Sequence, residues 1–394
     1  MALFFSIVML AIWVAAVGIT ATGTLLAFIY FRKGVKPVEE NQEWMPVTIL
    51  KPLKGIDPGL EENLDSFFNL DYPKFEILFS VADQDDPVIP GVKRLIARYP
   101  QIATKLYIGA ENFGFNPKIN NLIKAYDNSQ YGWVLISDSN TRFSRDHLKR
   151  LVRQIKEGVS LQTSVVAGVE PRGLGGLLEA VFLNTFYARS MVMVDAAGLT
   201  CVMGKAMLFQ KSIMDKTRGL RSLKKHINED YAAGRKFQLL GHKVQLSDNP
   251  VRQHIGNYSI GAFWSRHLRW GRIRKMQAPL VFLVEPVFSS ILSGLLGTLA
   301  FYRLWGVSPA LFLPIHMGFW LACDMVMASK VGDPLGWSFL PAWSFREAIH
   351  IPLWIHISLG STVIWRGQEL HLKRASILET RAESASDSQA RKMI

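Results

Sequence analysis

The chain contains very little cysteine. Its 394 residues include only two, Cys201 and Cys323, and these lie far apart without any spacing motif. A disulfide framework and a cysteine-ligated metal site are therefore excluded. The sequence also contains no P-loop, no Gly-x-Gly-x-x-Gly segment before a helix and no internal repeat. The low cysteine count is compatible with a reducing compartment.

Charge is absent from the start of the chain. Residues 1–31 include no Lys, Arg, Asp or Glu, and this run is long enough to cross a hydrocarbon core of about 30 Å. A cleaved signal peptide would have a basic start, a shorter apolar stretch and a small-residue cleavage site. Arg32, Lys33 and Lys36 follow the run, and the positive-inside rule places them in the cytosol. We therefore expect residues 2–31 to form a retained transmembrane anchor with its N-terminus outside.

Positive charge is concentrated in the middle of the chain. The whole sequence has 45 Lys+Arg and 32 Asp+Glu, which gives a net charge of +13. Residues 279–394 hold 9 basic and 8 acidic side chains, so that residues 32–278 carry a net charge of +12. A basic surplus suits a nucleotide or an anionic membrane surface. Residues 32–278 are accordingly predicted to form a cytosolic domain between apolar ends.

The C-terminal part contains three apolar stretches, at residues 279–302, 304–328 and 349–365. The first two are predicted to cross the membrane. A third full crossing would place the basic tail outside, against the positive-inside rule. One stretch is therefore expected to be re-entrant or interfacial, with the third as the candidate, and the number of crossings stays open. The predicted membrane region is residues 279–366. Residues 367–394 are expected to form a polar tail that is disordered at its end.

The central domain alternates between two kinds of segment. Short apolar or β-branched runs at 47–50, 75–81, 105–108 and 133–136 predict strands, and the periodic segments between them predict helices. This alternation predicts an α/β domain with a mostly parallel sheet. In such a sheet, groups that bind ligands gather at the carboxyl ends of the strands.

Asp138-Ser139-Asn140 directly follows the run 133–136. Two oxygen ligands two residues apart point the same way from an extended chain. They can hold Mg²⁺ or Mn²⁺, which also bridges phosphate oxygens of a substrate. The alternative is an Asx turn that caps the next helix. Asp138 and Asn140 are our candidate metal ligands.

A second acidic cluster also stands at a predicted strand end. Asp83, Asp85 and Asp86 follow the run 75–81, and Lys118 stands at the start of a predicted helix. In a nucleotide pocket, carboxylates would bind a base N–H and the lysine would bind phosphate. A polar turn before Pro87 and a solvated lysine explain the same residues equally well. The sequence leaves both interpretations open.

Two later motifs have the residue types of a transfer reaction. A carboxylate of Glu229-Asp230 can act as general base for a hydroxyl nucleophile, or it can stabilise a helix N-terminus. Arg266, Arg269 and Trp270 share one face of a helix. The arginines can neutralise a leaving diphosphate, and the tryptophan can form the floor of an acceptor site. The alternative is a juxtamembrane basic belt attracted to anionic lipid.

The order of these motifs resembles the D, D, D, (Q/R)xxRW signature of processive-type glycosyltransferases with a GT-A fold. Segments similar to those of the ceramide glucosyltransferase (glucosylceramide synthase) family are Leu50-Lys-Pro-Leu-Lys-Gly-Ile-Asp-Pro58, Asn116-Pro-Lys-Ile-Asn-Asn-Leu122 and Ile136-Ser-Asp-Ser139. The resemblance extends over roughly residues 47–374. It implies a Rossmann-like GT-A domain with membrane helices at both ends. It also implies transfer of a sugar with inversion and with UDP as leaving group.

The resemblance implies a role for each candidate residue. The expected substrate-binding residues are Lys51, Pro52, Asp83, Asp86, Lys118 and Glu229, with the uridine on Asp83 and Asp86 and the UDP on Lys118. The expected ligands of a divalent metal, Mg²⁺ or Mn²⁺, on the diphosphate are Asp138 and Asn140. The expected catalytic residues are Asp230 as the base, with Arg266, Arg269 and Trp270 at the diphosphate and acceptor.

The chain departs from the family pattern at two positions. Asn140 is a weaker metal ligand than aspartate, and Tyr187 stands where animal relatives have a histidine. The low cysteine content indicates a bacterial-type member. We therefore expect a multi-pass protein of the bacterial inner membrane, or of the Golgi or ER membrane if the source is eukaryotic.

The expected reaction transfers one hexose, most often glucose, from a UDP-sugar to the primary hydroxyl of ceramide at the cytosolic face. A ceramide glucuronosyltransferase that uses UDP-glucuronate is one alternative. A hopanoid-type lipid N-acetylglucosaminyltransferase is another. From a different class, the chain could be a catalytically silent lipid-binding membrane protein. The expected partners are a UDP-sugar, a lipid acceptor and the bilayer, without nucleic acid.

Overall fold

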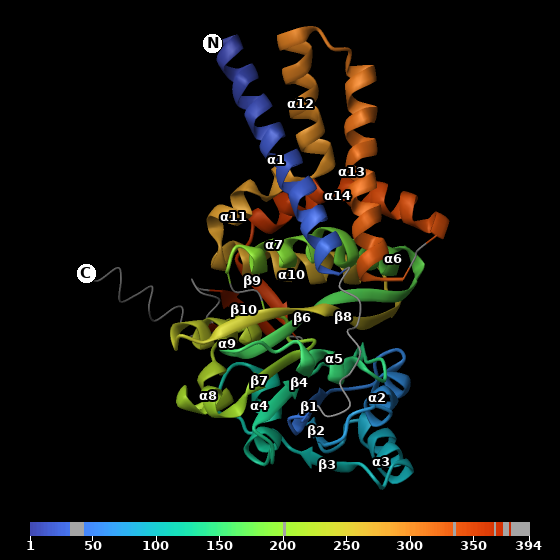
Figure 1. Cartoon of the computed structure of the whole chain (residues 1–394), viewed down its shortest axis with the longest axis vertical. Helices are drawn as coiled ribbons and strands as arrows, with labels where there is room; N and C mark the ends of the chain where they lie inside the picture. Colours follow the sequence, from blue (N-terminus) through green and yellow to red (C-terminus); the bar gives the residue numbers. More distant parts are fainter. Residues whose placement is uncertain (32–42, 200–201, 334–335, 366–367, 373–377, 380–394) are drawn as a thin grey trace, which may run out of the picture.

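The computed structural model describes residues 1–31, 43–199, 202–333, 336–365, 368–372 and 378–379 (Figure 1). The basic segment 32–36, Cys201 and the tail after Glu379 lie outside the described residues. The strands are β1 Val47–Leu53, β2 Phe75–Val81, β3 Ala103–Ile108, β4 Trp133–Ile136, β5 Thr141–Arg142, β6 Val159–Arg172, β7 Met207–Gln210, β8 Lys243–Asn257, β9 Thr362–Trp365, β10 Gln368–Leu372 and β11 Leu378–Glu379.

The α-helices alternate with strands through the first half of the chain and dominate its last third. They are α1 Ala2–Tyr30, α2 Leu60–Phe68, α3 Val88–Arg98, α4 Pro117–Asp127, α5 His147–Arg153, α6 Gly173–Phe182, α7 Ala188–Ala196, α8 Lys211–Lys216, α9 Glu229–Leu239, α10 Ile260–Gln277, α11 Pro279–Val284, α12 Ser290–Trp305, α13 Pro309–Val331 and α14 Phe339–Ser358. Short helical turns are η1 Leu183–Tyr187, a π-helix, and the 3₁₀ turns η2 Gly219–Leu223, η3 Glu285–Phe288 and η4 Gly336–Ser338.

An eight-stranded sheet forms the centre of the molecule, in the order β3-β2-β1-β4-β7-β6-β8-β5. β1 is parallel to β2 and β4, β2 is parallel to β3, and β6 is parallel to β8. β7 is antiparallel to both of its neighbours. The predicted α/β class with a mostly parallel sheet is confirmed, and the four predicted strands are β1 to β4. The long strands β6 and β8 were not predicted from the sequence pattern.

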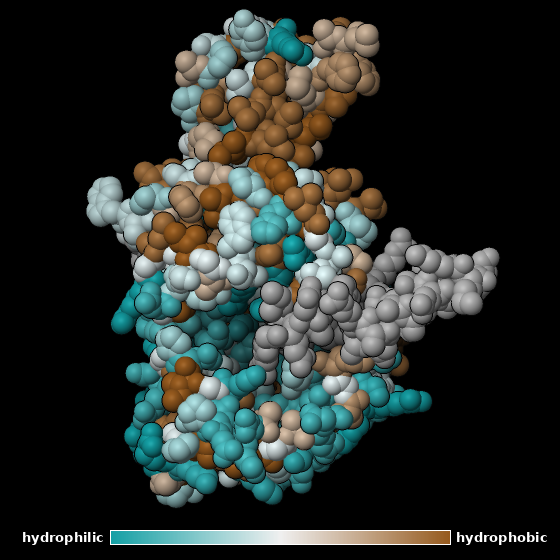
Figure 2. Space-filling model, turned by 180° about the vertical axis from the view of Figure 1, so that it is seen from behind, coloured by the Kyte–Doolittle hydropathy of each residue, from teal (hydrophilic) through white to brown (hydrophobic). Residues whose placement is uncertain are grey.

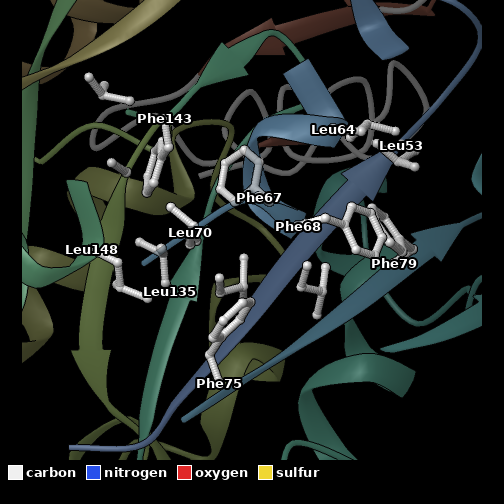
Figure 3. Close-up of a cluster of buried hydrophobic side chains, with 14 of the residues drawn as sticks. Leu53, Leu64, Phe67, Phe68, Leu70, Phe75, Phe79, Leu135, Phe143 and Leu148 are labelled. Atoms are coloured by element: carbon white, nitrogen blue, oxygen red, sulfur yellow. The ribbon is translucent and has the colours of Figure 1, made fainter. Parts of the chain in front are cut away.

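A large apolar cluster packs α2 and α3 against the sheet (Figure 3). Leu60, Leu64 and Phe67 recur at helical spacing on α2 and are buried against β1 and β2. The Phe67 ring contacts Phe143, with ring centroids 4.5 Å apart. This packing fixes the carboxyl ends of β1 and β2, after which the candidate site residues begin.

A layer of helices lies between the sheet and three upright helices, α1, α12 and α13 (Figure 1). In the layer, α6, α7 and α10 run across the direction of the upright helices. Figure 2 shows an apolar surface around the upright helices and a hydrophilic surface around the sheet. This division separates a membrane-facing part from a water-facing part.

Within the described residues, three helical segments are individually long and apolar enough to cross a membrane: α1, residues 173–196 and α13. Only 11% of the apolar window of α1 is buried inside the protein, whereas 61% of the window in residues 173–196 is buried. An apolar segment that is already covered by protein needs no lipid around it. We therefore regard residues 173–196 as part of the helical layer.

The apolar stretch 279–302 differs from the single straight crossing that was expected. α11 with η3 and the following α12 meet at an angle of 68°. Pro286 lies in η3, and the Ser289 hydroxyl then caps α12 by accepting a hydrogen bond from the amide of Leu292 at 3.2 Å. Glu285, just before the bend, forms an ion pair with Arg274 of α10 at 2.6 Å. α11 is thereby tied to the helical layer, and α12 packs against α1.

A buried charge holds the upright helices on the layer. Asp324 of α13 is fully buried and forms an ion pair with Arg189 of α7. Its second oxygen accepts a hydrogen bond from the indole of Trp343 of α14 at 2.7 Å and lies 3.6 Å from Arg346. One carboxylate thus connects three helices, and it compensates the buried arginines.

We expect Asp324→Asn to destabilise the protein by about 3–5 kcal/mol, because a buried arginine would lose its charged partner. The measurement is the melting temperature of the detergent-purified protein. Asp333→Asn is the matched control, since the Asp333–Arg252 pair is more than two-fifths exposed and its loss should cost less than about 1 kcal/mol. Equal shifts in the two variants would contradict this role of Asp324.

Candidate active site

A cavity of about 610 Å³ lies between the carboxyl edge of the sheet and the helical layer. Its walls come from the loops after β1 and β4, the segment before β7, the start of α9, and α10 with the π-helix η1. The predicted site residues that line it are Pro52, Lys118, Asp138, Asn140, Glu229, Asp230, Arg266, Arg269 and Trp270. Lys51, Asp83 and Asp86 are not among the lining residues.

Sheet register explains why distant segments meet at this edge. Ile136, the last residue of β4, is opposite Leu50 of β1 on one side and Met207 of β7 on the other. Because β7 is antiparallel, the residues before it stand beside the residues after β4. Asp138 therefore lies next to Lys205. The two form an ion pair of 3.0 Å.

The Lys118 ammonium joins two carboxylates, Asp138 at 2.9 Å and Glu229 at 2.8 Å. The side chain of Asn116 caps α4 by accepting hydrogen bonds from the amides of Lys118 and Ile119 and thereby fixes the lysine. Burial disfavours the charged lysine, but the two carboxylates outweigh burial and raise the pKa of Lys118. Burial would likewise raise the pKa of Asp138, but Lys118 and Lys205 hold it well below the ordinary aspartate value. This pair remains ionised around neutral pH.

Asp230 lies in the first turn of α9, directly after Glu229. Its carboxylate accepts hydrogen bonds from the amide of Gly204 at 2.9 Å and from its neighbour Tyr231 at 2.8 Å. Burial, and then the charge of Glu229, raise the pKa of Asp230 to about 6. A carboxylate with this pKa is ionised at neutral pH and takes up a proton more readily than an ordinary aspartate, as a general base must.

Gly204 is required by the close approach of its backbone to these charged groups. A Cβ at this position would lie 2.8 Å from the Lys118 ammonium. Such a distance is too short for a side-chain carbon, so any larger residue would displace the ammonium. The absence of a side chain at Gly204 thus permits its amide to reach Asp230.

α10 forms the wall of the cavity on the side of the helical layer. The guanidinium of Arg266 lies 4.3 Å from the centre of the Trp270 ring, and its Nε is 3.2 Å from Glu179. Glu179 is fully buried on α6 and also contacts His267 at 2.9 Å. The sequence analysis missed Glu179, although it is the only acidic residue in the apolar segment 173–194. Its carboxylate fixes the direction of Arg266.

Lys51 lies beneath the cavity and does not line it. The side chain is fully buried, and its ammonium donates to the backbone oxygen of Asp138 at 2.6 Å and to Thr141 at 3.3 Å. It also lies 3.8 Å from the centre of the Phe67 ring. Burial lowers the pKa of Lys51 well below the ordinary lysine value. The structure therefore gives Lys51 a supporting position under the loop after β4.

Asp83 and Asp86 stand at the end of β2, outside the cavity lining. Both oxygens of Asp86 accept from the amide of Gly55, at 2.9 and 3.0 Å, and one also accepts from Val88. Gly55 has a φ of +67°, which favours glycine there. Asp83 is exposed, and among the contacts described its carboxylate accepts a hydrogen bond only from the nearby Asp85 amide. Asp86 thus organises the loop after β1, and Asp83 leaves its carboxylate open to solvent.

The oxygens of Asp138 and Asn140 converge on one position. The Lys205 ammonium lies 3.0 Å from Asp138 Oδ2 and 2.7 Å from Asn140 Oδ1. An arrangement that holds one cation with two oxygens fits a divalent metal whose other ligands are phosphate oxygens and water. In the described part of the chain, no group of three or more His, Cys, Asp or Glu side chains is placed to hold a metal. The protein would therefore contribute few ligands.

The sheet, the acidic motif after β4 and the Arg-x-x-Arg-Trp motif on α10 together define a glycosyltransferase with a GT-A fold. The chain belongs to glycosyl transferase family 21, whose family model matches residues 5–378.

Relatives with known names are similar along most of the chain. Ceramide glucosyltransferase 3 of Caenorhabditis elegans is 30% identical over 85% of this chain and 74% of its own length. The ceramide glucosyltransferase of Komagataella phaffii is 28% identical over 83% of this chain and 82% of its own length. The chain is thus similar to ceramide glucosyltransferases over most of its length.

A solved structure has a similar fold. It is a mannosyltransferase from Pyrobaculum calidifontis in complex with GDP-Man and Mn²⁺. The similarity covers 91% of this chain and 98% of the other, with a TM-score of 0.50 and 17% sequence identity. At this identity the comparison supports the fold, and the site must be argued from its own residues.

We expect Asp83→Ala and Asp86→Ala to have different effects. Loss of the Asp86 carboxylate would release the amides of Gly55 and Val88 and cost about 1–2 kcal/mol of stability. Asp83→Ala should leave stability unchanged and weaken UDP binding. Melting temperature and calorimetric UDP affinity distinguish the two. Wild-type UDP affinity in Asp83→Ala would contradict its role at the uridine, and wild-type melting in Asp86→Ala would contradict its role in the loop.

Proposed function

We propose that the protein transfers one glucose from UDP-glucose to the primary hydroxyl of ceramide, with inversion at the anomeric carbon. The observation that carries this proposal is the position of Asp230, in a cavity with one wall from the sheet edge and one from the helical layer. A base in that position can meet a water-soluble donor on one side and a lipid on the other. The names of the curated relatives support glucose and ceramide.

Cationic side chains supply the proposed donor half of the cavity. Lys118, Lys205, Arg266 and Arg269 all line it, and a diphosphate carries the opposite charge. In our proposal, Lys118 supports the diphosphate, and Arg266 and Arg269 stabilise the charge that develops on the leaving UDP. A divalent ion bound by Asp138 and Asn140 would neutralise further negative charge on the diphosphate.

Aromatic and aliphatic side chains supply the proposed acceptor half. Phe182, Tyr187, Trp270 and Ile273 line the cavity from α6, η1 and α10. These elements belong to the helical layer beside the upright helices (Figure 1). A ceramide whose chains remain in the lipid could therefore present its hydroxyl to Asp230.

The proposed reaction is a single displacement. The Asp230 carboxylate takes the proton of the ceramide hydroxyl, while the hydroxyl oxygen forms a bond to the anomeric carbon. The bond from that carbon to the β-phosphate oxygen breaks, and its electron pair leaves with UDP. Attack opposite to the leaving group inverts the anomeric centre. The amides of Gly204 and Tyr231 hold the Asp230 carboxylate in place before proton transfer.

The membrane arrangement is proposed on the same basis. We infer that α1 anchors the protein with its N-terminus outside, that residues 32–278 face the cytosol, and that α12 and α13 are embedded in the bilayer. The exposed apolar side chains of α1 and α13, such as Leu25 and Ile315, support their contact with lipid. We propose a bacterial inner membrane as the site of action, from the low cysteine content.

The substrate proposal is tested with membranes that contain the expressed protein. Ceramide is supplied with UDP-glucose, UDP-glucuronate or UDP-N-acetylglucosamine in turn, and extracted lipids are identified by mass spectrometry. We expect a hexosylceramide with UDP-glucose only. Product from another donor, or from a hopanoid acceptor only, would replace the proposed substrates. Absence of any sugar transfer would support a lipid-binding protein without activity.

Asp230→Asn should lower transfer by about 100- to 10,000-fold, because the amide cannot take the proton. UDP affinity should be unchanged. In the unmutated protein, kcat/KM should fall as the pH decreases through about 6, since protonation removes the base. Asp127→Asn, on the surface near Arg221, serves as the control with normal turnover. Full activity of Asp230→Asn would exclude Asp230 as the base.

A further inference from the structure

Lys205 is a buried cation at the position where a divalent metal would bind. Its side chain is 11% exposed, and its ammonium contacts one charged oxygen, of Asp138, and one neutral oxygen, of Asn140. An ammonium removed from water requires such partners. The lysine therefore stabilises the two oxygens in the absence of any other cation.

The two lysines beside Asp138 are not held equally. Lys118 contacts two carboxylates, at 2.9 and 2.8 Å, and its pKa is raised. Lys205 shares Asp138 with Lys118, and its second hydrogen-bond partner among the described residues is the neutral amide oxygen of Asn140. The attraction that holds Lys205 is correspondingly weaker. A cation that enters this site would displace Lys205 before Lys118.

The neutral side chain of Asn140 is one reason why Lys205 is held more weakly than Lys118. An aspartate there would give the site a second carboxylate and a stronger attraction for a metal. With one carboxylate and one amide, the site has a single negative charge, which is already neutralised by ammonium groups. A divalent ion alone gains little from this set of ligands.

We propose that Lys205 is an internal competitor of the divalent cation, so that a metal binds tightly only together with a nucleoside diphosphate. The diphosphate provides the further oxygen ligands of the metal and, at the same time, a new anionic partner for the displaced ammonium. Binding of metal and binding of nucleotide then strengthen each other to the same degree. The proposal rests on the metal role of Asp138 and Asn140 proposed above.

The test measures Mn²⁺ binding to the full-length protein in detergent by electron paramagnetic resonance, first without nucleotide and then with UDP. Lys205→Met and Lys205→Gln remove the competing charge, and Lys205→Arg keeps it. Lys149→Met is the matched control, since Lys149 forms an ion pair of 2.7 Å with Asp71 on the surface. Asp138→Ala tests the metal site itself. Melting temperatures show which variants are folded. If either Lys205→Met or Lys205→Gln does not fold, the other neutral variant still allows the test.

Without UDP, Lys205→Met and Lys205→Gln should bind Mn²⁺ on the order of tenfold more tightly than the unmutated protein. Addition of UDP should strengthen Mn²⁺ binding less in these variants than in the unmutated protein. Lys205→Arg and Lys149→Met should behave like the unmutated protein.

Unchanged Mn²⁺ affinity in both neutral variants, with binding lost in Asp138→Ala, would overturn the role of Lys205 and leave the metal site in place. Mn²⁺ binding that persists in Asp138→Ala would instead reject the metal ligands, and with them the competition. No Mn²⁺ binding by any protein, with or without UDP, would reject both. None of these results depends on sugar transfer, so the proposed reaction is judged separately.

Discussion

The ion pairs of the Lys118 ammonium with Asp138 and Glu229 are the contacts on which the site depends. They connect the end of β4, the start of α4 and the start of α9, three segments that are far apart in the sequence. Buried charges must be compensated, and removal of one partner leaves the others unpaired. The cluster thus fixes the proposed base Asp230 next to Glu229 and, on its other side, the loop that carries Asn140.

Buried charges are also compensated below and above the cavity. Below it, the fully buried Lys51 donates to the backbone of Asp138 and keeps the loop after β4 in position. Above it, Glu179 of α6 holds Arg266 of α10 against Trp270. The loop of Asp138 and the side chain of Arg266 are therefore each held by a buried partner behind them. Such preorganisation avoids the cost of ordering these side chains when the substrate binds.

The helical layer links the cavity to the apolar upright helices. α10 supplies cavity residues from one face, and Arg274 near its end pairs with Glu285 at the bend before α12. α10 packs on α6 and α14, and α6 packs on β6 and β8 of the sheet. The bend of 68° lets the chain run along the layer and then turn beside α1. The acceptor side of the cavity and the apolar upright helices are thereby connected through a single continuous segment.

The sequence predicted the parts of this arrangement that depend on one strand or helix. Alternating strands and helices indicate the parallel sheet, and Asp138 follows from its place at a strand end. Contacts between segments that are far apart in the sequence are not encoded in local periodicity. Lys205, which meets Asp138 through the antiparallel strand β7, and Glu179 of α6, which meets Arg266 of α10, were therefore missed. Lys51 and Pro52 show that a sequence motif does not predict which of its residues face the cavity. Successive strand residues point to opposite faces, so Pro52 reaches the cavity while Lys51 is buried beneath it, and a shared motif cannot give both the same role.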